Sequence, residues 1–216
     1  MMKEKVGVVF SILADNSPIE GLTISKKVSE DNSINYFSLG SGTDISPESY
    51  NFNKLIIVTG GSLSLFSSAF SKEAGLGCAI ITPTEIPVGT KTENGAVYVE
   101  VELGSGTMVN ENLKAGEVFS LKNLIPYRKD SIVNLDVLSN SKTKFVVMAF
   151  DEGTALSEHA APGDAIVFAL EGKGIIGYEG KEYPIKEGEN FHFAKGGKHS
   201  VKADGQFKMA LLLSLE

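Results

Sequence analysis

The three histidines of this chain are its clearest candidates for chemistry. His159, His192 and His199 all lie in the C-terminal half, within a window of 41 residues. A neutral imidazole is a good ligand for divalent Zn, Ni, Fe or Mn, and a metal site needs ligands that converge in space. The single cysteine, Cys78, follows a glycine at the start of an apolar stretch, and we expect a buried, inert thiol there. The histidines therefore indicate a metal site without thiolate ligands.

Composition and charge exclude several classes of partner. The chain has 216 residues, a formal net charge of −7 and no cluster of Lys and Arg, so it lacks the concentrated positive charge that nucleic-acid binding requires. No run approaches the ~18 apolar residues of a membrane span. One cysteine cannot form an internal disulfide, which favours the cytoplasm. We expect a soluble protein that binds neither nucleic acid nor membrane.

An internal repeat organises the chain. At a displacement of 111 residues, without gaps, three pairs of glycines coincide: Gly42 with Gly153, Gly61 with Gly172, and Gly77 with Gly188. The apolar run 55–58 falls on the apolar run 166–169. Two copies of one fold follow, and we place their boundary between residues 1–105 and 106–216.

The start of the chain also belongs to this repeat. Basic residues precede the apolar stretch 6–14, an arrangement that is found in secretory signals. Residues 10–12, however, resemble residues 119–121 at a slightly smaller displacement. Because a secretion signal has no reason to recur in mid-chain, we predict that residues 6–14 are part of the folded structure.

The periodicity of each copy predicts short strands separated by turns. Glu179-Gly180 lies between two apolar-polar stretches and predicts a tight hairpin, since glycine supplies the positive φ that matches strand twist. No helical periodicity of useful length is present, which leaves antiparallel sandwiches, barrels and jelly rolls. The expected strands of the second half are 144–150, 165–170, 174–178 and 208–215.

The second half resembles the cupin superfamily. The first cupin motif is Gly, five residues, His-x-His, three or four residues, then Glu, and the chain supplies Gly153 and His159 at this spacing. Ala161 stands at the second histidine position and Ala165 at the glutamate position, with Asp164 one residue early. The usual set of four ligands is therefore incomplete.

The second cupin motif is better preserved in this half. Gly188, Gly196 and His199 fall at the spacings of that motif, whereas Ala194 replaces its proline and Ala203 its asparagine. The resemblance is strong over residues 131–216. It implies a cupin barrel that retains part of a metal site.

The first half resembles the same superfamily more weakly, over residues 20–104. Gly77 and Pro83 are in register with the second motif, but Glu48, Tyr50 and Val88 occupy the histidine positions. The resemblance thus implies a bicupin, an all-β chain of two tandem jelly-roll barrels. Residues 1–105 form a degenerate barrel without ligand histidines, and residues 106–216 form a barrel with a partial site.

The resemblance implies that His159 and His199 come from different strands and converge inside the second barrel. Asp164 is the nearest candidate for a third ligand, which would complete a two-histidine, one-carboxylate site. The alternative is that the two histidines line a metal-free polar pocket. His192 lies between Phe191 and Phe193 and points to the opposite face. It is exposed if the phenylalanines face inward, and a replacement ligand if they do not.

Two functions remain open at this point. One is a small-molecule enzyme in which a divalent Zn, Ni, Fe or Mn ion polarises a bound oxygen atom, or activates dioxygen or water. Its class, whether oxygenase, isomerase or lyase, and its catalytic residues are not fixed by the sequence. The other is a non-catalytic sensing module for a small polar or sugar-like ligand, which the missing ligands at Ala161 and Ala165 favour. In both, the first barrel can serve as an interaction surface, and pairing of sheet edges makes a homodimer possible.

Overall fold

Strands make up most of the structure, a computed structural model that describes residues 1–31 and 33–215. The helical elements are α1 (Ile12–Asp15) and the 3-10 turn η1 (Leu121–Asn123). Among the described residues, no helix has the length and apolar character needed to cross a membrane. These elements confirm the predicted all-β class. The strands are β1 (Val9–Phe10), β2 (Thr23–Lys27), β3 (Ile34–Leu39), β4 (Asp44–Glu48), β5 (Lys54–Phe66), β6 (Ser71–Gly75), β7 (Cys78–Ile81), β8 (Val88–Lys91), β9 (Ala96–Glu102), β10 (Met108–Val109), β11 (Val118–Ser120), β12 (Ile132–Ser139), β13 (Thr143–Phe150), β14 (Ala155–Ala160), β15 (Asp164–Tyr178), β16 (Lys181–Lys186), β17 (Asn190–Phe193) and β18 (Lys198–Ser214).

The chain forms two compact units, each a curled sheet of nine strands. The C-terminal barrel contains residues 1–11, 107–110 and 121–216. The N-terminal barrel contains residues 12–106 and 111–120. Both units are therefore assembled from segments that are separated in the sequence.

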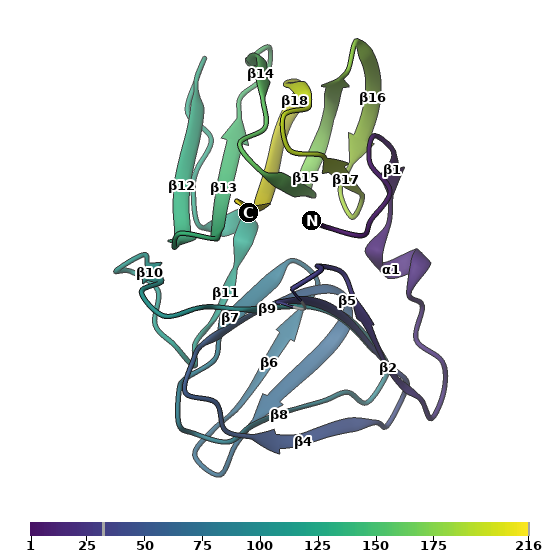
Figure 1. Cartoon of the computed structure of the whole chain (residues 1–216), viewed down its shortest axis with the longest axis vertical. Helices are drawn as coiled ribbons and strands as arrows, with labels where there is room; N and C mark the ends of the chain where they lie inside the picture. The colour runs from purple at the N-terminus through teal and green to yellow at the C-terminus, as the bar shows by residue number, and fades with distance from the viewer. Residues whose placement is uncertain (32, 216) are drawn as a thin grey trace. The chain divides into compact units, whose positions relative to one another are not determined.

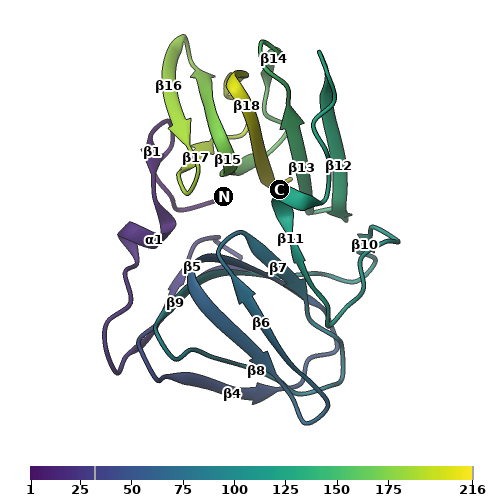
Figure 2. The same ribbon diagram turned by 180° about the vertical axis from the view of Figure 1, so that it is seen from behind.

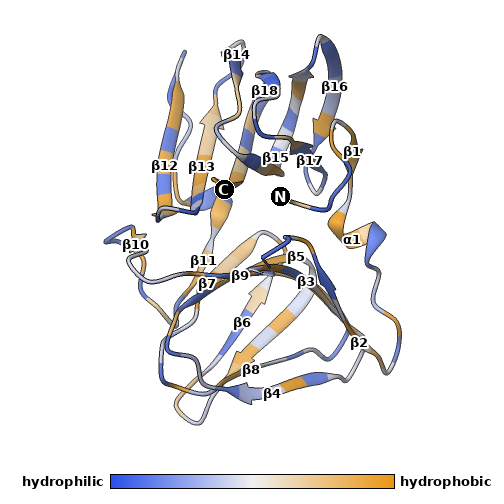
Figure 3. Ribbon diagram, viewed as in Figure 1, coloured by the Kyte–Doolittle hydropathy of each residue, from blue (hydrophilic) through white to orange (hydrophobic). Residues whose placement is uncertain are grey.

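In the C-terminal barrel, the strand order is β1-β17-β15-β18-β13-β12-β10, with β14 paired to β18 and β16 paired to β15 (Figure 1). The 17 residues of β18 pair with β13, β14 and β15, so this strand runs through both layers of the curled sheet. Figure 3 shows hydrophobic and hydrophilic residues alternating along β12, as expected for a strand with one face toward an apolar interior.

In the N-terminal barrel, the order is β11-β7-β5-β9-β3-β2. The strand β5 has 13 residues and pairs with β6, β7, β8 and β9, so it links the two layers of this sheet. The strands β4, β6 and β8 form the layer that is nearest to the viewer in Figure 2. Both barrels thus have the jelly-roll arrangement that the sequence predicts.

Two of the repeated glycines have the same structural role in both barrels. Gly61 and Gly172 have φ values of 72° and 74°, in the left-handed region that favours glycine. A Cβ atom on Gly61 would lie 2.1 Å from the carbonyl oxygen of Gly95, and one on Gly172 would lie 2.0 Å from that of Gln206. The sheet register shifts beside both residues, between Val58 and Gly60 in β5 and between Gly172 and Gly174 in β15. The glycines therefore permit a β-bulge that bends each long strand from one layer into the other.

Each barrel receives one short strand from the other half of the sequence. The first strand, β1, pairs antiparallel with β17, so that Phe10 lies opposite Asn190. The strand β11, which lies near the start of the second half, pairs in the same way with β7, and Phe119 lies opposite Ala79. The similarity of residues 10–12 to residues 119–121 is thus structural. Residues 6–14 are part of the folded structure, as predicted, with a strand at residues 9–10 and a short helix that begins at residue 12.

The predicted strands of the second half are present, with two differences. Residues 208–214 are the C-terminal part of the longer strand β18, which begins at residue 198. Residues 165–170 and 174–178 belong to a single strand, β15, because its bulges bend the chain without ending it. Glu179 and Gly180 join β15 to β16 with φ values of 48° and 76°. Two consecutive positive φ angles are those of a type I′ turn, so the hairpin prediction is confirmed.

Candidate functional site

His159 and His199 lie side by side in the C-terminal barrel. They are directly opposite each other in the antiparallel pair β14 and β18, just after a bulge that separates Leu156 from His159. Opposite residues of two strands share one face of a sheet. The centroids of the two imidazole rings are 4.1 Å apart. The expected convergence of these two histidines is confirmed.

Hydrogen bonds fix which nitrogen of each ring carries a proton. The Nδ1 atom of His159 lies 2.9 Å from the carbonyl oxygen of Ser157, and Nδ1 of His199 lies 3.2 Å from that of Gly197. A carbonyl oxygen can only accept, so each Nδ1–H donates and the lone pair of a neutral ring is on Nε2. Metal-binding histidines in proteins are commonly held by this kind of bond.

The surroundings of His199 keep its ring neutral and fixed. Burial lowers the pKa of His199, and the nearby imidazole of His159 adds to this effect, against the bond to Gly197, which raises it. The ring of Phe193 stacks on His199 at a centroid distance of 4.1 Å and an interplanar angle of 27°. His199 is only 5% exposed, whereas His159 is exposed. The pair thus has one rigid, buried member and one member accessible to solvent.

A cavity of about 450 Å³ opens beside the two histidines. Ala161 and Ala165, which stand at the ligand positions missing from the cupin pattern, both line it. Asp136 and Lys144 form an ion pair of 2.9 Å in its wall, with both side chains partly exposed. The other walls are largely apolar, formed by Val146, Met148, Leu156, Pro162, Leu211 and Leu213. The cavity is large enough for a small organic molecule.

Asp164 is not brought to the histidines. Its carboxylate accepts backbone hydrogen bonds from Met2 at 2.8 Å and from Lys195 at 2.9 Å, and its side chain is buried. Asp164 precedes the cavity-lining Ala165 on β15, so the two side chains point to opposite faces. No group of three His, Cys, Asp or Glu side chains suited to a metal ion occurs within residues 1–31 and 33–215. Asp164 instead ties the N-terminal segment to the loop before β18.

His192 has neither of the two expected environments. Phe191 and Phe193 belong to the apolar core of the barrel, so His192 points away from the interior. It is nevertheless fully buried, and its Nδ1 lies 2.8 Å from the carbonyl oxygen of Glu4. The expectation of an exposed histidine was therefore wrong, because the N-terminal segment at Glu4 lies against the side chain of His192.

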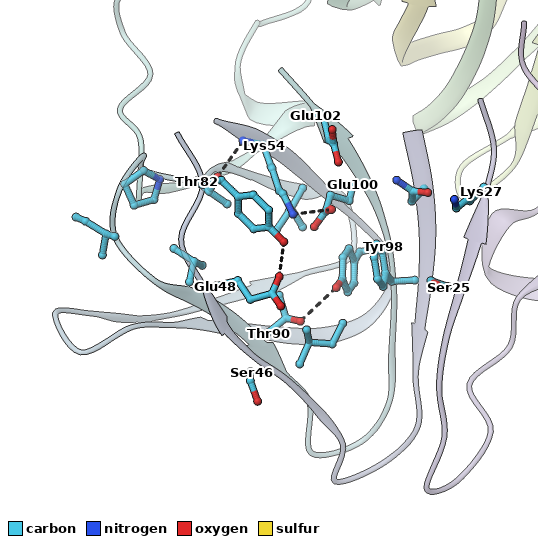
Figure 4. Close-up of a pocket in the computed structure, with 18 residues that line it drawn as sticks. Ser25, Lys27, Ser46, Glu48, Lys54, Thr82, Thr90, Tyr98, Glu100 and Glu102 are labelled. Carbon is cyan, nitrogen blue, oxygen red and sulfur yellow. Dashed lines mark hydrogen bonds and ion pairs between the residues drawn. The ribbon is translucent and has the colours of Figure 1, made fainter. Parts of the chain in front are cut away.

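The N-terminal barrel keeps the four ligand positions of the cupin pattern but fills them differently. At a displacement of 111, His159, Ala161, Ala165 and His199 correspond to Glu48, Tyr50, Lys54 and Val88. Glu48 lies opposite Val88 in the pair β4 and β8, after a bulge, just as His159 lies opposite His199. All four residues line one cavity of about 290 Å³ (Figure 4).

Sequence reasoning missed the polar side chains that complete this second cavity. Tyr98, Glu100 and Glu102 alternate along β9 and all line the cavity. Their period of two, with valines between them, is a readable signal for one polar face of a strand. Because other residues occupy the histidine positions of this barrel, the pattern of metal ligands does not point to this face of β9.

Comparison with known proteins supports the fold across the whole chain. Residues 146–215 match the Cupin_2 family, described as a cupin domain. A Cupin 2 conserved barrel domain protein from Leptotrichia buccalis has a similar structure, with a TM-score of 0.88, 22% identity and coverage of 99% of both chains. No curated protein sequence is significantly similar to this chain.

Two enzymes also share the two-barrel architecture. Salicylate 1,2-dioxygenase from Pseudoaminobacter salicylatoxidans has a TM-score of 0.64 and 10% identity, covering 95% of this chain and 80% of the enzyme. Oxalate decarboxylase from Bacillus subtilis, which has Mn(II) centres, has a TM-score of 0.57 and 11% identity, covering 98% of this chain and 78% of the enzyme. At these identities the likeness concerns the fold alone. The family match thus identifies a cupin domain within residues 146–215, and the structural likeness shows a cupin-like fold over both barrels.

Proposed function

We propose that the C-terminal barrel binds a divalent metal ion between His159 and His199 and acts on a small molecule in the adjoining cavity. The observation that carries this proposal is the pair of imidazoles, 4.1 Å apart, each with Nδ1 committed to a carbonyl oxygen. Both residues therefore offer an Nε2 lone pair, and both line the same cavity. Neutral imidazoles of this kind suit Zn, Ni or Fe, and less commonly Mn.

The donor set fits a weakly held, exchangeable metal. Two protein ligands leave the other coordination positions to water or to oxygen atoms of the small molecule, and two ligands alone hold a metal less tightly than three or four. When bound, a divalent ion supplies a Lewis acid that polarises an oxygen atom of the ligand. Oxygenase, isomerase and lyase chemistry are all compatible with this arrangement.

The chain's own residues prepare the cavity for a ligand. Phe193 stacks on His199 and fixes the orientation of its ring. Ala161 and Ala165 leave room beside the histidines where larger ligand side chains stand in the cupin pattern. The apolar walls formed by Val146, Leu211 and their neighbours favour a molecule with a hydrocarbon part and limit the access of water.

A second candidate is a non-catalytic module that binds a small polar or sugar-like ligand without metal. The specific observation in its favour is that no third His, Cys, Asp or Glu joins the pair among the residues described. In that case His159 and His199 act as hydrogen-bond partners of the ligand. The two candidates share the cavity and differ in their dependence on metal.

Metal binding by the whole protein separates these candidates. Protein purified without chelators is analysed for its metal content, stripped, and titrated with Zn²⁺, Ni²⁺, Fe²⁺ and Mn²⁺ by calorimetry. We expect a single site that His159→Ala and His199→Ala each weaken by at least about tenfold, since either change leaves one imidazole. Glu158→Ala, an exposed neighbour on β14, is the matched control and is expected to bind as the wild type does.

A lack of metal binding would contradict this proposal. Metal content below about 0.1 per chain, together with no thermal shift on adding millimolar metal, would reject the metal-dependent function. The cavity would then be the remaining support for the candidate function of metal-free ligand binding.

A further inference from the structure

The cavity of the N-terminal barrel contains a connected set of charged and aromatic side chains. The Nζ atom of Lys54 lies 3.0 Å from a carboxylate oxygen of Glu100, and both side chains are about nine-tenths buried, with exposures of 11% and 12%. The same ammonium lies 3.7 Å from the centroid of the Tyr50 ring. The hydroxyl of Tyr50 in turn donates a hydrogen bond to Glu48. A structural ion pair alone would not need these surroundings at the mouth of a cavity.

The opposite wall is aromatic and fixed. Phe37 and Tyr98 are stacked with their ring centroids 5.0 Å apart and an interplanar angle of 8°. The buried Tyr98 hydroxyl lies 3.2 Å from Oγ1 of Thr90. Figure 4 shows Glu48, Thr90 and Tyr98 turned toward the same interior space as Lys54 and Glu100. Ile45, Ile86 and Val88 add an apolar surface. A ligand with an aromatic or hydrocarbon face fits this wall.

The charged residues that line the cavity determine which polar group such a ligand can carry. Three carboxylates line the cavity, Glu48, Glu100 and Glu102, against the two ammonium groups of Lys27 and Lys54. The buried ammonium, Lys54, is already neutralised by Glu100 and covered by the Tyr50 ring. Burial raises the pKa of Glu100, and the charges of Glu102 and Glu48 raise it further, against the attraction of Lys54. A second cation relieves this repulsion, whereas an anion adds to it.

We propose that the N-terminal barrel is a second, metal-independent binding site for a small molecule that joins a cationic amine to an aromatic or hydrocarbon face. The site occupies the ligand positions of the cupin pattern, with Glu48, Tyr50 and Lys54 in place of His159, Ala161 and Ala165 of the other barrel. Glu48 and Glu100 receive the amine, and the wall of Phe37 and Tyr98 receives the apolar part.

Three probes with the same phenylethyl group and a different charge test the proposal: phenethylamine, 2-phenylethanol and 3-phenylpropionate. Each is titrated into the full-length, isotopically labelled protein, and amide chemical shifts are followed by NMR. We expect phenethylamine to shift amides around the cavity at low millimolar concentration, the alcohol to bind at least about threefold more weakly, and the anion not to bind up to about 10 mM. Addition of a chelator leaves these shifts unchanged.

Charge variants then locate the amine. Glu48→Gln, at an exposed position, is expected to weaken phenethylamine about three- to fivefold, while Glu93→Gln, an equal charge change outside the cavity, has no effect. Lys54→Met removes the competing cation and is expected to tighten amine binding, an effect that loss of structure cannot mimic. If Lys54→Met does not fold, the Glu48 and Glu93 pair still decides the test.

Three results would overturn the proposal. They are tighter binding of 3-phenylpropionate than of phenethylamine, phenethylamine binding that Glu48→Gln leaves unchanged, and no shift at the cavity with any probe.

Discussion

The interiors of the two barrels carry different chemistry on the same framework. In the C-terminal barrel, the pair β14 and β18 presents two imidazoles to a largely apolar cavity. In the N-terminal barrel, the corresponding pair β4 and β8 presents Glu48 and Val88, beside a buried Lys54–Glu100 ion pair. The bulge before each pair and the glycine bulge in each long strand are retained. The fold thus fixes where side chains meet, and residue identity decides what they bind.

The largest expected effect on this shared framework is that of a substitution at one of the repeated glycines. Gly172→Ala and Gly61→Ala place a Cβ against a backbone carbonyl at a positive φ, so each is expected to destabilise its own barrel by at least about 3 kcal/mol. Gly180→Ala, at a positive φ in open space, costs about 1 kcal/mol. Denaturant unfolding followed by NMR assigns each loss to one barrel. Equal, small losses at all three sites would contradict a common role for the bulges.

The next largest effect concerns an equivalent pair of residues with unequal roles. Asp164→Ala removes the acceptor of two backbone N–H groups, one in a buried and one in a partly buried hydrogen bond, and is expected to cost about 3 kcal/mol. Asn53, which corresponds to Asp164, donates one side-chain hydrogen bond to the carbonyl of Thr82, and Asn53→Ala is expected to cost about 1 kcal/mol. Urea denaturation measures both. If Asp164→Ala instead abolishes metal binding without loss of stability, Asp164 is a ligand after all.

The two cavities also differ in how deeply their ion pairs are buried. Lys54→Met leaves Glu100 buried without its partner and is expected to cost about 2 kcal/mol at pH 7. Lys144→Met breaks a partly exposed pair and costs less than about 1 kcal/mol. Because the folded-state pKa of Glu100 lies above its ordinary value of 4.5, the Lys54→Met deficit grows as the pH rises through that pKa and disappears below about 4.5. A deficit independent of pH would reject this cause.

The smallest expected effect sharpens the comparison by restoring a ligand. Ala161→His places a third imidazole in the cavity beside His159 and His199, and metal affinity is expected to rise at least about tenfold. Glu158→His, which adds a histidine outside the cavity, is expected to leave the affinity unchanged. Calorimetric titration with Zn²⁺ measures both. Equal gains in the two variants would show that the cavity does not direct coordination.

Much of the fold could be predicted because particular backbone conformations require particular residue types. Gly61 and Gly172 mark their bulges and Glu179-Gly180 marks its turn, since each needs a positive φ. The meeting of His159 and His199 was implied by the resemblance to the cupin superfamily. The role of Asp164 could not be predicted, because its partners are backbone amides, one of them 162 residues away. His192 was misjudged for the same reason: a distant segment covers it.

The exchange of β1 and β11 gives the chain an unusual connectivity. Each barrel contains one short strand from the beginning of the other half of the sequence. Cutting the chain near residue 106 therefore yields two fragments, and the first strand of each fragment belongs to the barrel formed mainly by the other fragment. Mixing the two fragments should consequently regenerate the folded protein, whereas neither fragment alone contains a full set of strands for its barrel.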